Sequence, residues 1–512
     1  MAEVIDRPAT LRLHAADPLI VAMRDIAAGE PLGERDLRAG EAITKGHKIA
    51  TRAIAAGEAV RKFNQVIGYA TQPIPAGRHI HTHNLAFHPT EADHSIGTDR
   101  RSVNILAESE AATFQGIVRP DGRVATRNYL GVLTTVNCSA TVARHIAETF
   151  RHPGALDLYP NIDGVVALTH RTGCGIAAEG EPIDVLRRTL AGYARHANFA
   201  GVVIVGLGCE ANQMKRLFEA EQLERSNTLH SYVMQEEGGT AATVRAGISA
   251  LKEMLPAANQ VKRTTVSAKH LTVGLQCGGS DGFSAISANP ALGAAVDLLV
   301  RNGGSAILSE TPEIYGAENI LLRRAVDDKV GRKLLDLIEW WEKHAAAHGG
   351  SLDNNPAPGN KAGGLTTILE KSLGAVAKGG TTDMVDVYKY AEPITTHGFV
   401  FMDSPGYDPV SATGQVAAGA NLIAFTTGRG SCFGCKPVPS IKLATNSPMY
   451  QKMAEDMDIN CGEVVDGTAS VEQMGERIFE LMLSVASGTK SKSEAYGYGE
   501  DEFAPWQLGA TF

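Results

Sequence analysis

The sequence contains no long apolar run. A membrane-spanning helix needs about 18 or more consecutive apolar residues, and no such stretch occurs in the 512 residues. The first residues, MAEVIDRPATLRLHAADP, have neither the basic segment nor the apolar core of a secretory signal peptide. These absences predict a protein that does not cross a membrane and that works in the cytoplasm.

Positive charge is also scarce. Lysine and arginine total 48 against 57 acidic residues, which gives a formal net charge of -9. A nucleic-acid-binding surface needs a basic excess, so this class of partner is not expected. The 21% of charged and 44% of hydrophobic residues are typical of folded globular chains and exclude extensive disorder.

Cysteine is infrequent, and the number of cysteines is odd. The chain has seven cysteines, which does not fit a framework of disulfides in a protein of this length. In a reducing compartment each cysteine is an inert core residue, a metal ligand or a catalytic group.

Glycine, by contrast, is abundant. The 54 glycines make up roughly a tenth of the chain, against a usual share of about 7%. They gather in phrases such as GLGCE, CGGSDG and TTGRG and form no low-complexity run. Because glycine has no side chain, the backbone of such loops can approach a ligand closely.

The pattern of apolar residues predicts several domains, and at roughly 150 residues each the length allows two to four. Residues 1–90 form a small β-rich module in which a turn phrase recurs at 26–30, 54–58 and 74–77. Residues 91–112 are a polar linker. Apolar runs then alternate with amphipathic stretches, which predicts α/β domains with mainly parallel, Rossmann-like sheets over 113–262 and 263–512, divided near Pro256. A helix is expected over 321–348 and a loop over 354–364.

Four cysteines follow predicted strands. The strands are expected at 129–136, 164–168, 201–206 and 271–275, and the cysteines are Cys138, Cys174, Cys209 and Cys277. Ligands of open α/β sheets bind beyond the carboxyl ends of the strands, and thiolates suit iron–sulfur clusters, iron or zinc. The four thiols are therefore predicted to converge on a metal, with simple packing beneath the loops as the alternative.

The other three cysteines give weaker indications. Cys432 and Cys435 form a CxxC, which is a redox pair, half a metal site or an incidental pair in a loop. Cys461 is expected to be structural.

Histidines gather in the N-terminal module. If residues 79–83 form a strand, His79, His81 and His83 project from one face and can share a metal. His14 and His47 lie in the same module. The sequence predicts a second metal site or a domain interface here, with a solvated edge strand as the alternative.

Three further side chains have positions that suit catalysis or binding. His170 follows a strand and precedes Cys174, where it is either a general base or a structural residue. Lys361 and Arg429 lie in glycine-rich turns and are either carboxylate-binding residues or ordinary surface cations. Neither the GxxxxGK[ST] nor the GxGxxG pattern is matched, so a nucleotide site is not indicated.

Several phrases together resemble the altronate/galactarate dehydratase family of sugar-acid hydro-lyases. They stand in the family's order at 206–210 (GLGCE), 277–281 (CGGSD), 288–290 (ANP), 358–361 (PGNK) and 427–430 (TGRG), and the resemblance covers nearly the whole chain. It implies an N-terminal SAF-type β domain, a large catalytic part, and loss of water from a polyhydroxy acid with iron(II) or manganese.

The resemblance also implies site residues. Positions matching both the altronate and the galactarate types are Cys138, His170, Cys174, Cys209, Glu210, Cys277, Asp281, Glu310, Lys361, Glu370, Lys371 and Arg429. Positions resembling the altronate type alone are His14, His81, His83 and Asn84, which favours an aldonic acid. The chain departs from the family at TGRGSCFGCKP, where TGRGTPYG is expected, and a related sulfo-lyase eliminates sulfite. The substrate and the leaving group therefore stay open.

We expect a dehydratase that converts a 2,3-dihydroxy acid such as altronate into a 2-keto-3-deoxy acid. The four strand-end cysteines are assigned to iron, as an iron–sulfur cluster in preference to mononuclear Fe²⁺, with Mn²⁺ as an alternative. His170 is the expected base, and the other catalytic candidates are Lys361, Lys371 and Glu310. The substrate-binding candidates are Arg429, Asn360, Asp281, Ser280 and Glu210. A homodimer is the expected assembly, and a non-catalytic sugar-acid sensor is the hypothesis from another class.

Overall fold

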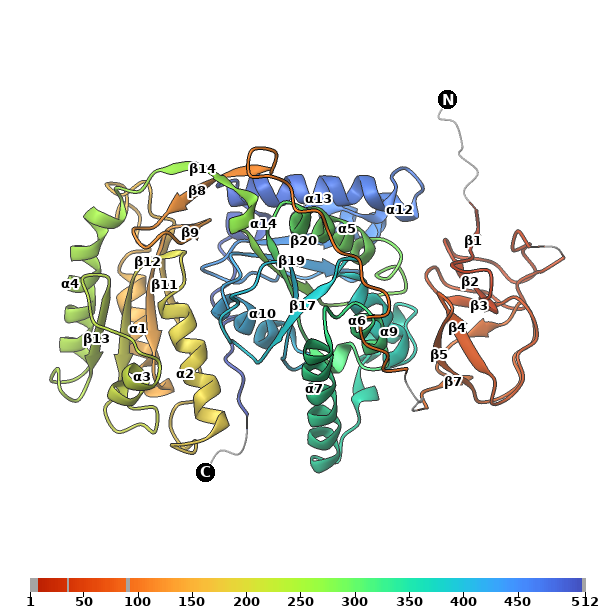
Figure 1. The fold of residues 1–512 in the computed structure, drawn as a ribbon, viewed down its shortest axis with the longest axis horizontal. Coiled ribbons are helices and arrows are strands. Elements are labelled where there is room, and N and C mark those ends of the chain that lie inside the picture. The colour runs from red at the N-terminus through yellow and green to blue at the C-terminus, as the bar shows by residue number, and fades with distance from the viewer. Residues whose placement is uncertain (1–7, 35, 89–92, 509–512) are drawn as a thin grey trace.

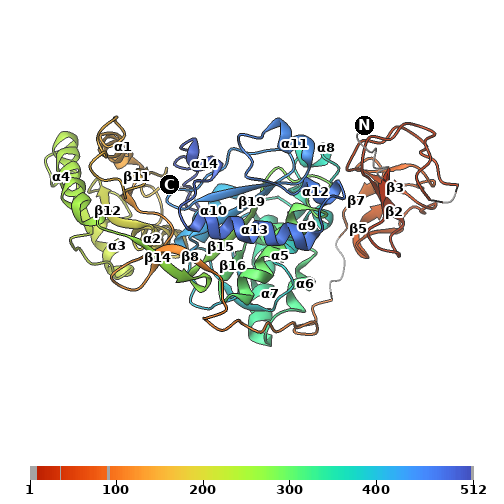
Figure 2. The same ribbon diagram turned by 90° about the horizontal axis from the view of Figure 1, so that it is seen from above.

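The computed structural model describes residues 8–34, 36–88 and 93–508, which form three blocks in a row (Figures 1 and 2). A small β-rich module lies at one end, a large α/β block at the centre and a second α/β block at the other end. The predicted fold class is confirmed. Among the described helices, none combines the length and the apolar character needed to cross a membrane.

The N-terminal module consists of two antiparallel sheets, with strand orders β1-β2-β3-β6 and β4-β5-β7. Its strands are β1 (Thr10–Leu11), β2 (Leu19–Ala22), β3 (Lys48–Ala50), β4 (Ala59–Lys62), β5 (Gln65–Ala70), β6 (His79–Ile80) and β7 (Leu85–Ala86). The recurring phrase forms turns as predicted. Its glycines Gly29, Gly57 and Gly77 have φ angles of 80°, 81° and 79°, which glycine adopts without strain.

The second block contains a parallel sheet of order β11-β10-β12-β13. Its strands are β10 (Tyr129–Thr134), β11 (Gly164–Leu168), β12 (Phe199–Gly206) and β13 (Leu229–Val233). Its helices are η1 (Asn137–Ser139), α1 (Ala140–Glu148), α2 (Glu181–Ala194), α3 (Met214–Ala220) and α4 (Thr240–Ala258). The expectation that Pro256 interrupts the pattern is wrong, because this proline lies inside the last turn of α4.

A three-stranded antiparallel sheet connects the two α/β blocks. It has the order β14-β8-β9 and contains β8 (Thr113–Val118), β9 (Val124–Ala125) and β14 (Arg263–Ser267). The chain thus enters and leaves the second block through neighbouring strands, as the top of Figure 1 shows.

The central block is built on seven parallel strands of order β17-β18-β16-β15-β19-β20-β21. These are β15 (Thr272–Cys277), β16 (Ser305–Leu308), β17 (Met384–Tyr388), β18 (Phe399–Met402), β19 (Leu422–Thr427), β20 (Ser440–Ala444) and β21 (Ile459–Asn460). Successive side chains of a strand point to opposite faces. Leu308 and Phe401 accordingly share a core with α5 (Ala288–Arg301) and α13 (Val471–Ala486), whereas Ile307, Val400 and Ile423 pack with α10 (Asp408–Ala417) and with α2.

The remaining helices correct two expectations. They are η3 (Thr311–Glu313), α6 (Glu318–Leu322), α7 (Asp328–Ala347), α8 (Pro358–Ala362), α9 (Ile368–Ala377), α11 (Ser447–Lys452), α12 (Gly462–Val465) and α14 (Lys492–Ala495). The single helix expected over 321–348 is two helices, because Asp327 accepts a hydrogen bond from the Val330 N–H and caps the start of α7. The loop expected over 354–364 contains the short helix α8.

The order of the seven strands defines a switch point. From β15 the chain continues to β16, β17 and β18 on one side, and then returns to place β19 on the other side of β15. Open α/β sheets bind ligands beyond the carboxyl ends of the strands that flank such a point. The residues that follow β15 and β19 are therefore well placed for a site.

A buried ion triad seats the N-terminal module on the central block. Lys48 and Lys62 of the module place their ammonium nitrogens 2.8 and 2.9 Å from the Glu370 carboxylate on α9, and all three side chains are at most 1% exposed. Burial alone raises the pKa of Glu370, but the two lysines outweigh it and hold that pKa below the usual range. Glu370 therefore carries its charge at neutral pH.

Glycines bring the backbones together beside this triad. A Cβ atom on Gly282 would lie 2.1 Å from the Gly46 carbonyl oxygen, and one on Gly364 would lie 2.5 Å from the same atom. Both distances are shorter than any non-bonded contact allows, so only glycine permits this approach. The junction between the module and the central block thus depends on backbone contact as well as on charge.

Replacement of Glu370 by glutamine is expected to lower the free energy of unfolding by about 3–5 kcal/mol, because two buried ammonium groups lose their counter-charge. Urea unfolding followed by circular dichroism measures this change. The control Glu58→Gln removes an exposed ion pair with Arg52 in the same module, where the side chains are 31% and 56% exposed, and costs less than about 1 kcal/mol. Equal stability of the two variants would contradict the role of the triad.

Candidate functional site

Acidic, basic and thiol groups meet at the carboxyl edge of the seven-stranded sheet. Cys277 is the last residue of β15, and Glu310 and Glu313 follow β16. The ligand atoms of these three buried residues all lie within 4.8 Å of one another. Lys371 and Lys378 come from α9 and its C-terminal cap, and their separation of seven residues places them on one face of the helix.

The lysines neutralise this cluster. The Lys378 ammonium donates to the Cys277 sulfur over 3.0 Å and lies 3.7 Å from the Glu310 carboxylate. The Lys371 ammonium donates to Glu313 over 2.6 Å. Buried charges are tolerated when they are paired in this way. Burial alone lowers the pKa of Lys371, but Glu313 and Cys277 outweigh it and raise that pKa, so the ammonium persists at neutral pH.

Glu310 is held in an unusual state. Its φ of 73° is in the left-handed region, which costs a non-glycine residue about 1 kcal/mol or more. Both carboxylate oxygens are buried, and neither has a hydrogen-bond partner in the described part of the chain. Burial, and then the charge of Glu313, raise its pKa well above the usual range. Such a carboxylate is ready to take a proton or a metal.

Asp408 completes the acidic part of the site. It begins α10, and its carboxylate lies against Gly278, where a Cβ atom would come within 2.2 Å of Oδ2. Burial, and then the charge of Glu313, raise the pKa of Asp408 to about 7. A carboxylate with this pKa can exchange protons at neutral pH.

Two cations lie beside the glycine-rich loop that follows β15. Arg429 follows β19 and is exposed, and its Cβ lies 3.3 Å from the place of a Cβ on Gly279. Lys361 lies on α8, which is tied to this loop because the Asn360 side chain donates to the Ser280 carbonyl over 2.9 Å. Neither cationic group forms a hydrogen bond or ion pair with another described residue. The Ser280 hydroxyl is buried and likewise unpaired in the residues described.

The structure thus brings together many of the predicted residues. Those that meet at this edge are Cys277, Ser280, Glu310, Asn360, Lys361, Lys371 and Arg429. Three further members were not predicted, namely Glu313, Lys378 and Asp408. Glu313 and Lys378 could have been found, because Glu313 shares a loop with Glu310 and Lys378 follows Lys371 by two helical turns. Asp408 carries no comparable signal in the sequence.

Two predicted carboxylates are already engaged as loop ties. Asp281 accepts hydrogen bonds from the hydroxyls of Thr445 and Ser284 over 3.0 and 3.1 Å. Glu210 lies in the second block, where it accepts from the Thr135 hydroxyl and the Gly208 N–H over 2.6 Å each. These contacts hold the loops at the strand ends in place.

The four strand-end cysteines belong to two different sheets. Cys138, Cys174 and Cys209 are exposed and follow β10, β11 and β12 of the second block, whereas Cys277 is buried in the central block. The described residues contain two groups of at least three His, Cys, Asp or Glu side chains whose ligand atoms lie within 4.8 Å of one another. Neither group contains the three exposed thiols. A metal on those three cysteines stays a prediction.

His170 is buried beside the exposed thiols, and both of its ring nitrogens are engaged. Nε2 lies 2.8 Å from the Thr134 carbonyl oxygen, and Nδ1 accepts from the Thr172 N–H over 3.3 Å. Burial lowers the pKa of His170 to about 4. This geometry fits a neutral histidine that holds two strand ends together, and its role as a base stays a prediction.

The histidines of the N-terminal module are arranged differently from the expectation. The strand ends at Ile80, so residues 79–83 do not form one continuous strand face. The second group of ligand atoms within 4.8 Å consists of His47, His79 and His81. His14 lies outside it and accepts a hydrogen bond from the Ala16 N–H.

The CxxC residues lie in different environments. Cys432 is exposed and Cys435 is buried, and burial raises the pKa of the Cys435 thiol to about 12. Cys461 is buried, in line with the structural role expected for it.

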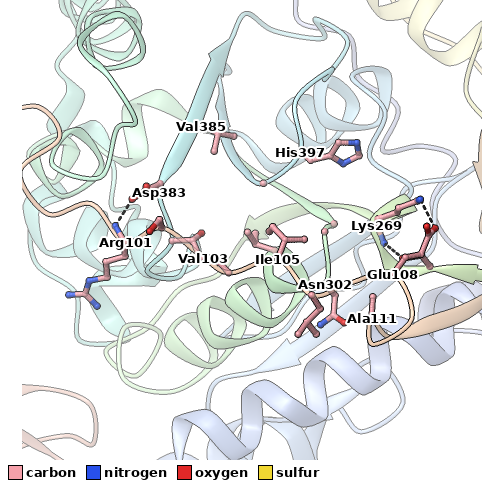
Figure 3. A pocket seen from close by; sticks show the side chains of 18 of the residues that line it. Arg101, Val103, Ile105, Glu108, Ala111, Lys269, Asn302, Asp383, Val385 and His397 are labelled. Atoms are coloured by element: carbon pink, nitrogen blue, oxygen red, sulfur yellow. Dashed lines mark hydrogen bonds and ion pairs between the residues drawn. The ribbon is translucent and has the colours of Figure 1, made fainter.

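A cavity of about 530 Å³ lies at the opposite, amino edge of the seven-stranded sheet. Figure 3 shows that Val103 and Ile105 of the linker line it together with Val385 and His397, while Lys269 pairs with Glu108 at one end. Its lining is mainly apolar and contains no group of acids comparable to that at the carboxyl edge. The chemistry therefore favours the carboxyl edge as the site.

Comparison with known proteins relates nearly the whole chain to one family of enzymes. Family models match residues 8–88 as the SAF domain of altronate/galactarate dehydratase, 116–259 as the second domain of D-galactarate dehydratase/altronate hydrolase, and 268–511 as the C-terminal part of D-galactarate/altronate dehydratase. Altronate dehydratase of Bacillus subtilis is 36% identical over 98% of this chain and 99% of its own length. Altronate dehydratase of Escherichia coli is 33% identical, covering 96% of this chain and 97% of its own, and its galactarate dehydratase (L-threo-forming) is 36% identical, covering 94% and 93%.

Proposed function

The chain belongs to the altronate/galactarate dehydratase family, and we propose that it removes water from an aldonic acid of the altronate type at the carboxyl edge of the seven-stranded sheet. The broader activity is that of a sugar-acid dehydratase, a carbon–oxygen lyase. The observation that supports this location is the buried cluster of Cys277, Glu310, Glu313, Lys371 and Lys378 beside a glycine-rich loop. His14, His81, His83 and Asn84 resemble the altronate type and favour an aldonic over an aldaric acid.

The donor set at this edge fits iron(II) or manganese. Cys277, Glu310 and Glu313 offer a thiolate and two carboxylates within 4.8 Å, and the Glu310 oxygens have no hydrogen-bond partner among the described residues. Burial raises the pKa of the Cys277 thiol to about 11, so metal binding must release its proton. A metal held by these residues supplies a Lewis acid that stabilises negative charge on substrate oxygens.

The exposed Arg429 and the half-buried Lys361 suit the carboxylate of the substrate. The Arg429 guanidinium can bind a carboxylate through two parallel hydrogen bonds, and the Lys361 ammonium adds a second positive charge. The Ser280 hydroxyl on the glycine-rich loop has no hydrogen-bond partner among the described residues and can bind a substrate hydroxyl. These groups place C2 and C3 of the acid toward the buried cluster.

Asp408 and Lys371 carry the proton transfers. Asp408 removes the proton on C2, and the electron pair of that C–H bond forms the C2–C3 double bond. The C3–O bond breaks, and the Lys371 ammonium gives a proton to the departing hydroxyl, which leaves as water. The enol then tautomerises to the 2-keto-3-deoxy acid, and the proton on Asp408 returns to Lys371. Lys378 stays cationic and balances the buried acidic groups of the cluster, of which Glu310 lies 3.7 Å away.

The function is tested by turnover on a panel of aldonic acids, aldaric acids and sulfolactate, after anaerobic loading with Fe²⁺. A keto acid is expected from aldonic acids, with altronate the best substrate and no sulfite released. Preference for an aldaric acid would overturn the assignment of substrate, and sulfite release would make the enzyme a carbon–sulfur lyase. Binding of these acids without any turnover would support a sensor.

Asp408→Asn is expected to lower kcat by about 10²–10⁴-fold, because the base is lost while the shape is kept. In the unmodified enzyme, kcat/KM is expected to fall as the pH decreases below about 7, since protonation of Asp408, whose pKa is about 7, removes the base. Steady-state kinetics from pH 5 to 9 measure both effects. The matched control is Asp328→Asn on the exposed start of α7, which leaves the profile unchanged. If kcat/KM of Asp408→Asn still falls below about pH 7, the assignment of Asp408 as the base is contradicted.

Iron content distinguishes the two candidate metal sites. Cys277→Ser is expected to lose one equivalent of bound Fe²⁺ together with the activity, because it removes the soft ligand at the buried cluster. Cys209→Ser removes an exposed thiol of the second block and is expected to keep the iron. Metal and sulfide analysis of anaerobically purified variants measures this. Loss of iron and acid-labile sulfide in Cys209→Ser would instead support a cluster on Cys138, Cys174 and Cys209.

A further inference from the structure

Three imidazoles of the N-terminal module meet where the module touches the central block. His47 directly precedes β3 and His79 begins β6, and these strands pair antiparallel with Lys48 opposite Ile80. This register places His47 opposite His81. The ring centroid of His47 lies 5.0 Å from that of His79 and 5.0 Å from that of His81. The centroids of His79 and His81 are 5.2 Å apart.

Neighbouring groups orient the three rings. The Nδ1 atom of His47 lies 2.9 Å from Nε2 of His79, and its Nε2 lies 3.4 Å from the Ala362 carbonyl oxygen of α8. The Asn84 side chain accepts from the His81 N–H over 2.9 Å and donates to the His79 carbonyl over 2.8 Å. Histidines that bind metals commonly give their second ring N–H to a carbonyl oxygen, as His47 does to Ala362.

The three rings are shielded from solvent to different degrees, since His47 is buried and His79 and His81 are half-buried. The Nδ1 atom of His81 is buried and has no hydrogen-bond partner among the described residues. Such an unpaired buried nitrogen is unfavourable unless a ligand binds to it.

We infer that His47, His79 and His81 bind a divalent transition metal of the zinc or iron class, at a site separate from the catalytic cluster. Three imidazoles suit these metals, and a fourth position stays open for water or another ligand. With nitrogen–metal distances of about 2.0–2.1 Å, tetrahedral ligands lie roughly 3.3 Å apart, so the 2.9 Å pair needs to open by only a few tenths of an ångström.

The position of this site suggests what the metal does. His47 contacts α8, the helix that carries Asn360 and Lys361, through the carbonyl of Ala362. A metal on the three histidines therefore stiffens the junction between the module and the substrate-binding helix. This inference does not rest on the proposed function, because the three ligands all belong to the N-terminal module.

Zinc titration of the full-length protein tests the site. The Cys277→Ser background excludes the buried cluster, and isothermal titration calorimetry of the metal-free protein with Zn²⁺ is expected to show one equivalent that depends on the histidines. The double variant His79→Ala/His81→Ala is expected to weaken that equivalent by at least about 100-fold. The matched control His83→Ala changes a neighbouring histidine that is not one of the three ligands, and this variant is expected to keep the Zn²⁺ equivalent. Co²⁺ bound at the site gives visible ligand-field bands without a thiolate charge-transfer band.

Three results would overturn the inference. Unchanged Zn²⁺ affinity in a double variant with native circular dichroism would exclude these ligands. Binding in the His83→Ala protein only at millimolar Zn²⁺ would make the site adventitious. A thiolate charge-transfer band in the histidine-dependent Co²⁺ spectrum would move the metal to the cysteines. Absence of turnover on sugar acids, by contrast, would refute the proposed function and leave these titrations unaffected.

Discussion

The buried charge of Glu370 is the constraint on which the arrangement of the site depends. A carboxylate this deeply buried is stable only with opposite charges beside it, and both of them come from the N-terminal module. The same helix, α9, carries Lys371 and ends at Lys378. The electrostatic pairing that docks the module therefore also sets the position of the helix that supplies both cations to the catalytic cluster.

The catalytic cluster follows the same rule of paired charge in a dry environment. Two lysines face Glu310, Glu313 and Asp408, and the low dielectric constant of the interior separates their proton affinities. The pKa of Lys371 is raised and that of Asp408 is raised to about 7, so the cluster holds both a donor and an acceptor of protons. Pairs of titratable groups whose surroundings move their pKa values in different directions are typical of acid–base catalysis.

The glycine excess has a specific use in this fold. Gly278 leaves room for the Asp408 carboxylate, and Gly282 and Gly364 let two loops of the central block approach the backbone of Gly46. Any side chain at these positions would collide with a carboxylate or a carbonyl. The abundance of glycine seen in the composition thus reflects close packing around the site and the domain junction.

Local patterns sufficed for the elements of this protein and for part of its site. Apolar runs predicted β10, β11, β12 and β15, because a buried parallel strand is a short apolar segment whatever surrounds it. The prediction of a single helix over 321–348 was wrong. Asp327 caps the start of a new helix inside this stretch, although the apolar residues there recur with a helical period. Glu310 was found after a predicted strand and Arg429 in a glycine-rich phrase, whereas Lys371 was predicted only from the resemblance to the family.

Which strand ends share a site was decided only by the tertiary structure. Local patterns showed that four cysteines follow strands, but they do not reveal the order of the strands. The structure assigns Cys277 to a different sheet from Cys138, Cys174 and Cys209. Likewise, Lys48 lies 322 residues from Glu370 along the chain, and His47 meets His81 through strand register. Contacts between distant segments depend on how the buried surfaces of whole domains fit together, and no short stretch of sequence contains that information.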